Sequence, residues 1–198
     1  MQRDRVKIRP MSTHSPKPHP QPLSAGGPGR RLITTLQLKP MPFIFSPINS
    51  GSARVILTWR YDEPYDFYNL DSGQISESVQ QFLHPHNAYY TITNGHGDLA
   101  AYCCFGLDAR VSGGDYSAEA LDVGLGIRPN LTRRGLGLRV VDAVLNFAQS
   151  KFAPILFRVT VAEFNQQALR ICEKAGFQPV QRFQRDLDGK HFVVLTKV

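Results

Sequence analysis

The segment between residues 118 and 150 constrains the fold more than any other part of the chain. Residues 118–127 are predicted to form a strand. Residues 133–150 are predicted to form a long helix with apolar side chains on one face: Val140, Val141, Val144, Leu145 and Ala148. The N–H groups in the first turn of a helix are unpaired and carry a partial positive charge, which suits a pyrophosphate. The segment therefore predicts a strand–loop–helix unit that binds a phosphate-bearing ligand.

Two glycines at the start of this helix, Gly135 and Gly137, allow an anion to approach the backbone, and Arg133 and Arg134 add positive charge beside them. A Walker loop is excluded because the chain has no Gly-Lys-Ser/Thr sequence. A dinucleotide fingerprint is disfavoured because Val140 stands where the third glycine would be, and the next strand, residues 155–160, ends without an acid. The alternative is that the glycines only permit close packing of strand and helix.

The rest of the chain alternates between strand and helix patterns. Strands are predicted at 42–46, 88–93, 99–105, 155–161, 178–185 and 191–197, and further helices at 50–60, 75–83 and 166–174. The turn at residues 94–97 contains Asn and Gly, which accept positive φ, and predicts a hairpin. This order predicts an α/β (α+β) fold with a mixed, mostly antiparallel sheet of six to seven strands and helices on both faces.

The net charge of +7 is confined to the first 40 residues. These residues hold eight basic side chains and one acid, whereas the remaining 158 hold fifteen of each. Because the rest of the chain carries no net charge, a basic nucleic-acid-binding face is disfavoured, although the basic segment alone could contact phosphates. Residues 1–40 are rich in Pro, Ser and Gly, so we predict a disordered tail and a single domain at 41–198. Met41 is a second candidate for the translation start.

The cysteines and histidines predict no metal site. Cys103, Cys104 and Cys172 form no C-x-x-C pair and are interpreted as buried thiols in a reducing compartment. His84 and His86 have no third ligand nearby in the sequence. The chain contains neither a run of about 18 apolar residues nor an N-terminal apolar segment typical of a secretory signal. We therefore predict a cytoplasmic protein without a membrane span.

Two motifs follow each other with a predicted strand between them. The first reads Thr132-Arg-Arg-Gly-Leu-Gly137, and the second reads Asn165-Gln-Gln-Ala-Leu-Arg-Ile-Cys172-Glu-Lys-Ala-Gly-Phe177. They resemble the motifs Gln/Arg-x-x-Gly-x-Gly/Ala and Asn-x-x-Ala-x-x-x-Tyr-x-x-x-Gly-Phe of the GNAT N-acetyltransferase superfamily, and the resemblance extends over residues 42–198. Thr132 and Cys172 are the departures from the two patterns.

The resemblance implies acetyl-CoA as the ligand of the glycine loop. In this family the strand before the loop and the strand after the long helix splay apart, and the pantetheine arm lies between them. The implied contacts in this chain are Leu125, Gly126 and Ile127 for the pantetheine amides, Arg133, Arg134, Gly135, Leu136, Gly137 and Leu138 for the pyrophosphate, and Asn165 for the arm. A neutral amine attacks the thioester directly, and a strand N–H polarises its carbonyl.

The acid–base residues are where the chain departs most from the family. Cys172 stands where the family has the tyrosine that protonates the departing thiolate; a thiol can donate a proton, and a buried core role is the alternative. Glu119 and Asp122 are the candidate bases, and their odd spacing places them on opposite faces of the strand, with Glu119 favoured. Thr160 replaces the Glu found in members that acetylate protein N-termini, which disfavours that substrate class.

The resemblance implies that the wall facing the acceptor lies at the loop of residues 61–69. Four carboxylates, counting Asp71, and the interleaved aromatic residues would suit a cationic amine; an ordinary solvated loop is the alternative. The sequence thus predicts an acetyl-CoA-dependent N-acetyltransferase acting on a primary amine of a small molecule or protein. Two alternatives stay open: a non-catalytic acyl-CoA-binding module, and a nucleic-acid-associated protein acting through residues 1–40. The sequence does not settle the oligomeric state, for which a homodimer is one option.

Overall fold

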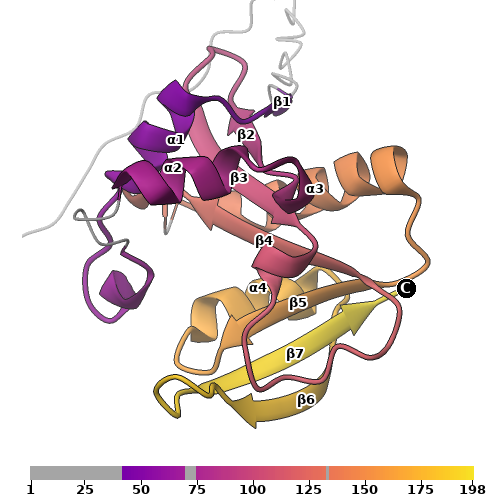
Figure 1. Ribbon diagram of the computed structural model, residues 1–198. Helices are drawn as coiled ribbons and strands as arrows, with labels where there is room; N and C mark the ends of the chain where they lie inside the picture. Colours follow the sequence, from indigo (N-terminus) through magenta and orange to yellow (C-terminus); the bar gives the residue numbers. More distant parts are fainter. Residues whose placement is uncertain (1–41, 70–74, 133) are drawn as a thin grey trace, which may run out of the picture. The chain divides into compact units, whose positions relative to one another are not determined.

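The computed structural model describes residues 42–69, 75–132 and 134–198 (Figure 1). The chain divides into two units, Met1–Gln37 and Leu38–Val198, and every described residue lies in the second. The predictions that concern the tail at 1–40, Met41, Asp71 and Arg133 lie outside the described residues.

A seven-stranded sheet forms the centre of the second unit, in the order β1-β2-β3-β4-β5-β7-β6 (Figure 1). The strands are β1 (Ile44–Pro47), β2 (Tyr90–Thr93), β3 (Leu99–Phe105), β4 (Leu121–Ile127), β5 (Phe157–Ala162), β6 (Gln178–Gln184) and β7 (His191–Lys197). All neighbouring strands are antiparallel except β4 and β5, which are parallel. The predicted mixed, mostly antiparallel sheet is confirmed.

Four α-helices cover the sheet: α1 (Ser50–Leu57), α2 (Ile75–Leu83), α3 (Leu136–Phe152) and α4 (Gln166–Lys174). Short 3-10 helices are η1 (Tyr65–Tyr68), η3 (Pro85–Asn87), η4 (Leu107–Ala109) and η5 (Pro129–Leu131). Helix α3 begins later than predicted because Gly135 adopts a left-handed φ of 74° immediately before it. Within the described ranges, no helix combines the length and the apolar character needed to cross a membrane.

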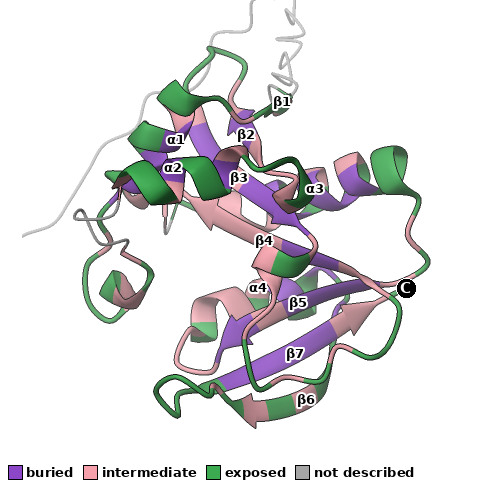
Figure 2. Cartoon of the chain, in the orientation of Figure 1, coloured by how far each residue is buried: buried purple, intermediate pink, exposed green. Residues whose placement is uncertain are grey.

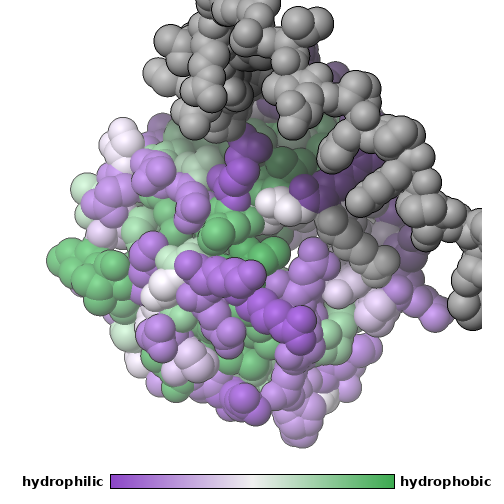
Figure 3. Space-filling model, turned by 180° about the vertical axis from the view of Figure 1, so that it is seen from behind, coloured by the Kyte–Doolittle hydropathy of each residue, from purple (hydrophilic) through white to green (hydrophobic). Residues whose placement is uncertain are grey.

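Side chains alternate between the two faces of the sheet, and each face carries its own apolar cluster. Ala101, Cys103 and Phe105 of β3 pack with the apolar face of α3 and with Cys172 and Ala175 at α4. Tyr102 lies beside the other cluster, which is formed mainly by α1 and α2. Helices therefore cover both faces of the sheet, as predicted. Figure 3 shows the side opposite to that of Figure 1, where hydrophobic residues near the middle of the face are surrounded by hydrophilic ones.

Strands β4 and β5 are paired only where they begin. Leu121 pairs with Phe157 and Asp122 with Arg158, and the pairing stops there. Beyond this point β4 continues beside β3 and β5 continues beside β7. The two strands diverge toward the left of Figure 1, and Figure 2 shows β4 changing from buried to partly exposed along its length. The splayed parallel pair expected from the resemblance is present.

Candidate active site

The opening between β4 and β5 is lined by main-chain groups. In an antiparallel pair, successive residues direct their N–H and C=O groups alternately toward and away from the partner strand. The N–H of Gly106 bonds to the carbonyl of Asp122 at 3.0 Å, so the even-numbered residues of β4 bond to β3. Leu125 and Ile127 therefore turn their main-chain groups toward the opening. Gly126, which was predicted to join them, directs its own toward β3.

The opposite side of the opening is lined in the same way. The N–H of Glu163 bonds to the carbonyl of His191 at 2.9 Å, so the odd-numbered residues of β5 bond to β7. Thr160 consequently presents its main-chain groups toward β4 across the opening, whereas the carbonyl of Ala162 accepts a hydrogen bond from the N–H of Asn165 at 2.9 Å. Two rows of amide groups facing each other suit an extended ligand that itself carries amides.

The closed end of the opening is held by a buried ion pair. Arg158 donates from Nε to Oδ1 of Asp122 at 2.5 Å and from Nη2 to Oδ2 at 2.9 Å, and Arg110 donates from Nε to Oδ2 at 2.7 Å. The side chains of Asp122 and Arg158 are only 2% and 3% exposed. The ring of Tyr116 lies against both guanidinium groups: its centroid is 5.2 Å from Cζ of Arg110 and 4.9 Å from Cζ of Arg158. The hydrogen bonds to Asp122 raise the pKa of Arg158 above its ordinary value.

This ion pair does not suit the predicted role of Asp122 as a general base. Three N–H donors occupy its two oxygens, and its charge balances the buried Arg158 and the partly exposed Arg110. Protonating such a carboxylate would leave the arginines without their counter-charge, which is costly in a buried site. Asp122 therefore has a structural role at the junction of the two strands.

Glu119 is also poorly placed for the predicted role. It is exposed and precedes Leu121, the first residue of β4, so it lies outside the strand and near its closed end. A strand rises about 3.3 Å per residue, so Leu125 lies roughly 13 Å along the strand from Leu121, and Glu119 lies further back still. Glu119 therefore lies far along the strand from Leu125 and Ile127, whose main-chain groups line the opening.

Cys172 lies in the apolar core. Its residue is 6% exposed and belongs to the cluster that includes Val140 and Phe177. Burial raises the pKa of the Cys172 thiol to about 11. The core alternative drawn from the sequence therefore fits this position better than proton donation does.

The two glycines of the turn, Gly135 and Gly137, have different surroundings. Gly135 is exposed, has positive φ, and would meet no atom within 4 Å if it carried a Cβ. It precedes the first turn of α3, which has neither a side-chain cap nor an acidic residue, and exposed Arg134 lies next to it. At Gly137, by contrast, the side chain of Ile171 of α4 fills the space of the missing Cβ. Gly135 fits the anion role, and Gly137 fits the packing alternative.

Leu136 and Leu138 are the other predicted contacts of the turn. Both are half-buried and lie in the first turn of α3. Their main-chain N–H groups are among those that a helix leaves unpaired at its start. The close contact between Gly137 and Ile171 places this turn directly beside α4. The predicted phosphate site and the second sequence motif therefore meet in space.

Asn165 stands at the open end of the splayed strands. Its Oδ1 accepts a hydrogen bond from the N–H of Ala168 at 3.0 Å and so caps α4. Its Nδ2 donates to the hydroxyl of Tyr68 at 3.2 Å. The side chain predicted to bind the cofactor arm thus also connects α4 to the loop at residues 61–69.

Two tyrosines of this loop contact the two diverging arms of the sheet. The hydroxyl of Tyr61 donates to the carbonyl of Ile127 on β4 at 3.0 Å, and burial raises the pKa of Tyr61 to about 12. The hydroxyl of Tyr68 lies against Asn165 and the backbone of Ala162, at the end of β5. Burial raises the pKa of Tyr68, and these two hydrogen bonds partly offset that rise. The loop therefore bridges the open end of the site.

A small aromatic cavity lies where the two tyrosines approach each other. It is lined by Ile56, Trp59, Tyr61, Tyr68 and Tyr102. Its volume of about 10 Å³ for the centre of a water molecule is close to that needed for a single water. Trp59 is 8% exposed, and its Nε1 is buried without a hydrogen-bond partner among the described residues.

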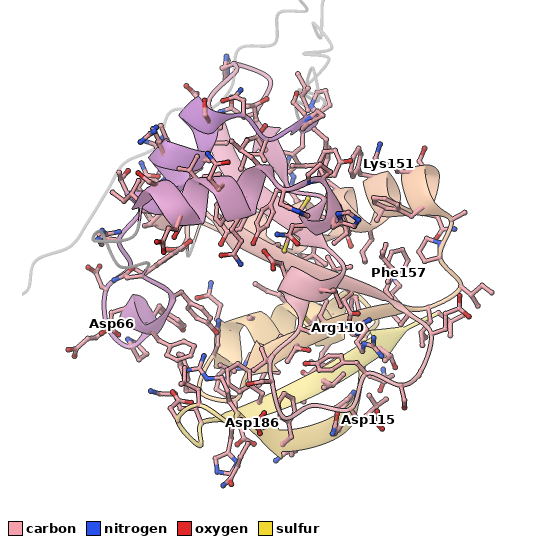
Figure 4. All side chains as sticks on the ribbon, viewed as in Figure 1. Asp66, Arg110, Asp115, Lys151, Phe157 and Asp186 are labelled. Atoms are coloured by element: carbon pink, nitrogen blue, oxygen red, sulfur yellow. The ribbon has the colours of Figure 1, made fainter. Side chains whose placement is uncertain are left out.

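The carboxylates of the loop do not line this cavity. Asp62, Glu63 and Asp66 are all exposed, and Asp66 points away from the sheet (Figure 4). The ring of Phe67 takes the opposite direction and packs edge-on against Phe164 at 5.4 Å. The carboxylates of the loop therefore lie on its exposed side, and the expected wall for an amine stays a prediction.

The comparisons with known proteins agree with this geometry. A model of the acetyltransferase (GNAT) family matches residues 53–177, which run from α1 to the end of the second motif. The chain therefore belongs to the GNAT acetyltransferase family. No match was found among the curated proteins.

Solved structures share the fold at low sequence identity. A GNAT-family acetyltransferase from Bacillus anthracis is 12% identical with a TM-score of 0.62, over 81% of this chain and 96% of that one. A chimera of the spermidine N-acetyltransferase of Vibrio cholerae and hSSAT is 13% identical with a TM-score of 0.60, over 79% and 95%. An aminoglycoside N(6')-acetyltransferase from Legionella pneumophila is 16% identical with a TM-score of 0.59, over 80% and 93%.

Proposed function

We propose that this chain is an acetyl-CoA-dependent N-acetyltransferase that acetylates a primary amine of a small molecule or protein. The observation that carries the proposal is the opening between β4 and β5, lined by main-chain groups of Leu125 and Ile127 and bordered at its wide end by Asn165. An arm with amide groups can bond to both sides of such an opening. Membership of the GNAT family supports the same reaction.

The residues of the glycine turn fit the charged end of acetyl-CoA. The first turn of α3 offers main-chain N–H groups, Gly135 leaves the space above them open, and no acid in that turn opposes an anion. Arg134 adds a positive charge at an exposed position. We therefore assign the pyrophosphate to residues 134–138, with Gly137 acting by bringing the turn close to α4.

The reacting end is assigned to the tyrosine-lined end of the opening. Bound acetyl-CoA would supply an activated acetyl group there. The N–H of Leu125 points into the opening and can polarise a carbonyl oxygen. The cavity between Tyr61, Tyr68 and Tyr102 has room for about one water, so an alkylammonium ion would approach these rings from outside the cavity and must then lose a proton to become the nucleophile.

We place the reaction in the cytoplasm. Cys103, Cys104 and Cys172 are all free and buried, as expected of a protein kept in a reducing compartment. Expression of a tagged chain followed by fractionation of the cells tests this assignment.

A ligand titration followed by a turnover assay tests the proposed function. The full chain is heated with acetyl-CoA, CoA or NADH, and we expect the two CoA compounds, but not NADH, to raise its melting temperature. Release of free CoA is then followed with a panel of amines that includes a polyamine, an aminoglycoside and a lysine peptide. The first two are chosen because the names of structural neighbours specify such substrates. The absence of a shift with both CoA compounds would contradict the proposal.

A non-catalytic acyl-CoA-binding module is the second candidate. The observation that favours it is that Glu119, Asp122 and Cys172, the three acid–base residues predicted from the sequence, are each badly placed for catalysis. Stabilisation by acetyl-CoA without release of CoA in the presence of any amine would support this module over the enzyme.

A further inference from the structure

None of the acid–base residues predicted from the sequence is well placed to protonate the sulfur of CoA. Another side chain at the open end of β4 and β5 must then be considered for this role. If acetyl transfer takes place there, the thiol of CoA must leave as a thiolate or receive a proton. Cys172 is buried in the core and is unsuited to supply that proton. We propose that Tyr68, on the loop at residues 61–69, protonates the departing sulfur. This inference rests on the proposed acetyltransferase function.

The hydrogen bonds of Tyr68 leave its proton available. Nδ2 of Asn165 donates to the Tyr68 hydroxyl at 3.2 Å. The hydroxyl oxygen therefore acts as the acceptor in this contact, and among the described residues no acceptor takes its O–H. The Asn165 donor also stabilises the phenolate that remains after the proton has been given away.

The packing of η1 holds this hydroxyl in place. The ring of Tyr68 lies 5.9 Å from that of Phe164, and the neighbouring Phe67 packs edge-on against Phe164 at 5.4 Å. Phe164 directly precedes Asn165, so the same turn of chain supports both the ring and its hydrogen-bond donor. Tyr68 is thus fixed to Asn165 at the start of α4, and it is also one of the residues that line the cavity.

The other tyrosines of the loop are less suited to this role. Tyr61 reaches the opposite arm, but its O–H proton is donated to the carbonyl of Ile127 at 3.0 Å. The ring of Tyr65 lies 6.4 Å from Phe164, and Tyr65 does not line the cavity. Tyr61 therefore holds the end of β4 in place. Tyr65 lies in η1 together with Tyr68 and offers a matched control.

The step balances as a group transfer. The nitrogen of a neutral primary amine forms a bond to the acetyl carbon as the C–S bond breaks, and the electron pair of that bond leaves on sulfur. The O–H of Tyr68 passes its proton to the sulfur, which gives free CoA. The amide nitrogen loses its extra proton to water, and the phenolate of Tyr68 takes one back from solvent.

Turnover of three variants tests this assignment. We expect Tyr68→Phe to lower kcat by on the order of 100-fold, the lower end of what general acid catalysis contributes. Tyr65→Phe and Cys172→Ala should each keep kcat within about 3-fold of the unchanged chain. Equal kcat values for Tyr68→Phe and Tyr65→Phe, or a large loss in Cys172→Ala alone, would overturn the proposal.

A binding measurement separates a contact with sulfur from a merely structural role. Calorimetric titrations compare CoA with desulfo-CoA, which lacks the sulfur atom, at a pH where the thiol is ionised. A hydrogen bond to a charged group is worth about 10-fold or more in affinity, so Tyr68→Phe should weaken CoA binding by that factor and leave desulfo-CoA binding unchanged. Equal losses for both ligands would contradict proton donation.

The outcomes also distinguish this inference from the proposed function. If the unchanged chain binds neither CoA compound, the proposed function itself fails. If the unchanged chain binds acetyl-CoA and turns it over, and Tyr68→Phe does so equally well, only the assignment of Tyr68 fails.

Discussion

The two ends of the β4–β5 junction are joined by different chemistry. At the closed end Asp122 and Arg158 form a buried ion pair, which is completed by Arg110. At the open end Tyr61 and Tyr68 reach the separate arms through single, neutral hydrogen bonds from a loop. Breaking one partner of a buried ion pair costs about 3–5 kcal/mol, whereas a neutral hydrogen bond contributes about 1 kcal/mol. The contrast indicates a stiff junction at one end and an adjustable closure at the other.

The largest expected effect comes from the closed end. Asp122→Ala leaves the buried Arg158 without its counter-charge, and we expect the free energy of unfolding to fall by about 3–5 kcal/mol. Urea denaturation followed by circular dichroism measures the change. Arg182→Gln is the control, because the Arg182 side chain is 75% exposed in its pair with Glu163 and should contribute less than about 1 kcal/mol. Similar costs for the two variants would remove the distinction between the ends.

The next effect concerns ligand binding without loss of the fold. Gly135→Glu places a carboxylate at the start of α3, so acetyl-CoA affinity should fall by on the order of 100-fold or more. Gly189→Glu is matched in backbone and space: Gly135 and Gly189 have φ of 74° and 68°, and neither would place a Cβ within 4 Å of another atom. Each variant should lose about 1–2 kcal/mol of stability from its left-handed conformation. Calorimetry with acetyl-CoA should separate them, and equal affinities would show that the turn does not bind phosphate.

The smallest expected effect lies at the open end. Tyr61→Phe removes the hydrogen bond to the Ile127 carbonyl, and we expect the free energy of unfolding to fall by about 0.5–1.5 kcal/mol. The same urea titration used for Asp122→Ala measures it. A loss as large as that of Asp122→Ala would mean that the loop at 61–69 is a structural clamp and not an adjustable closure.

The parts of the site that depend on local sequence could be predicted. The strand, the glycine turn and the apolar face of α3 have their own spacing, which can be recognised in the sequence. The first residue of α3 was placed too early because the left-handed conformation of Gly135 separates the arginines from the helix. The side of the strand to which Gly126 directs its main chain required the register with β3.

The environments of the candidate acid–base residues could not be predicted, because they are formed by distant parts of the chain. Arg158 lies 36 residues after Asp122, and no local pattern shows that the two form a buried pair. Tyr68 and Asn165 are 97 residues apart, and a loop has no periodicity that indicates which side chains turn inward. The motif alone pointed to Cys172, whose burial depends on how α4 packs. Tyrosines in the loop were visible in the sequence, but their contacts with β4 and α4 were not.

Amide hydrogen exchange along β4, resolved by NMR, tests the central claim most directly. Without ligand, the N–H groups of Leu125 and Ile127 should exchange faster than those of Gly124 and Gly126, which face β3. Acetyl-CoA should slow the exchange of Leu125 and Ile127 while leaving the two glycines almost unchanged. Equal protection of all four amides without ligand, or protection by acetyl-CoA that spares Leu125 and Ile127, would contradict a ligand held between the diverging strands.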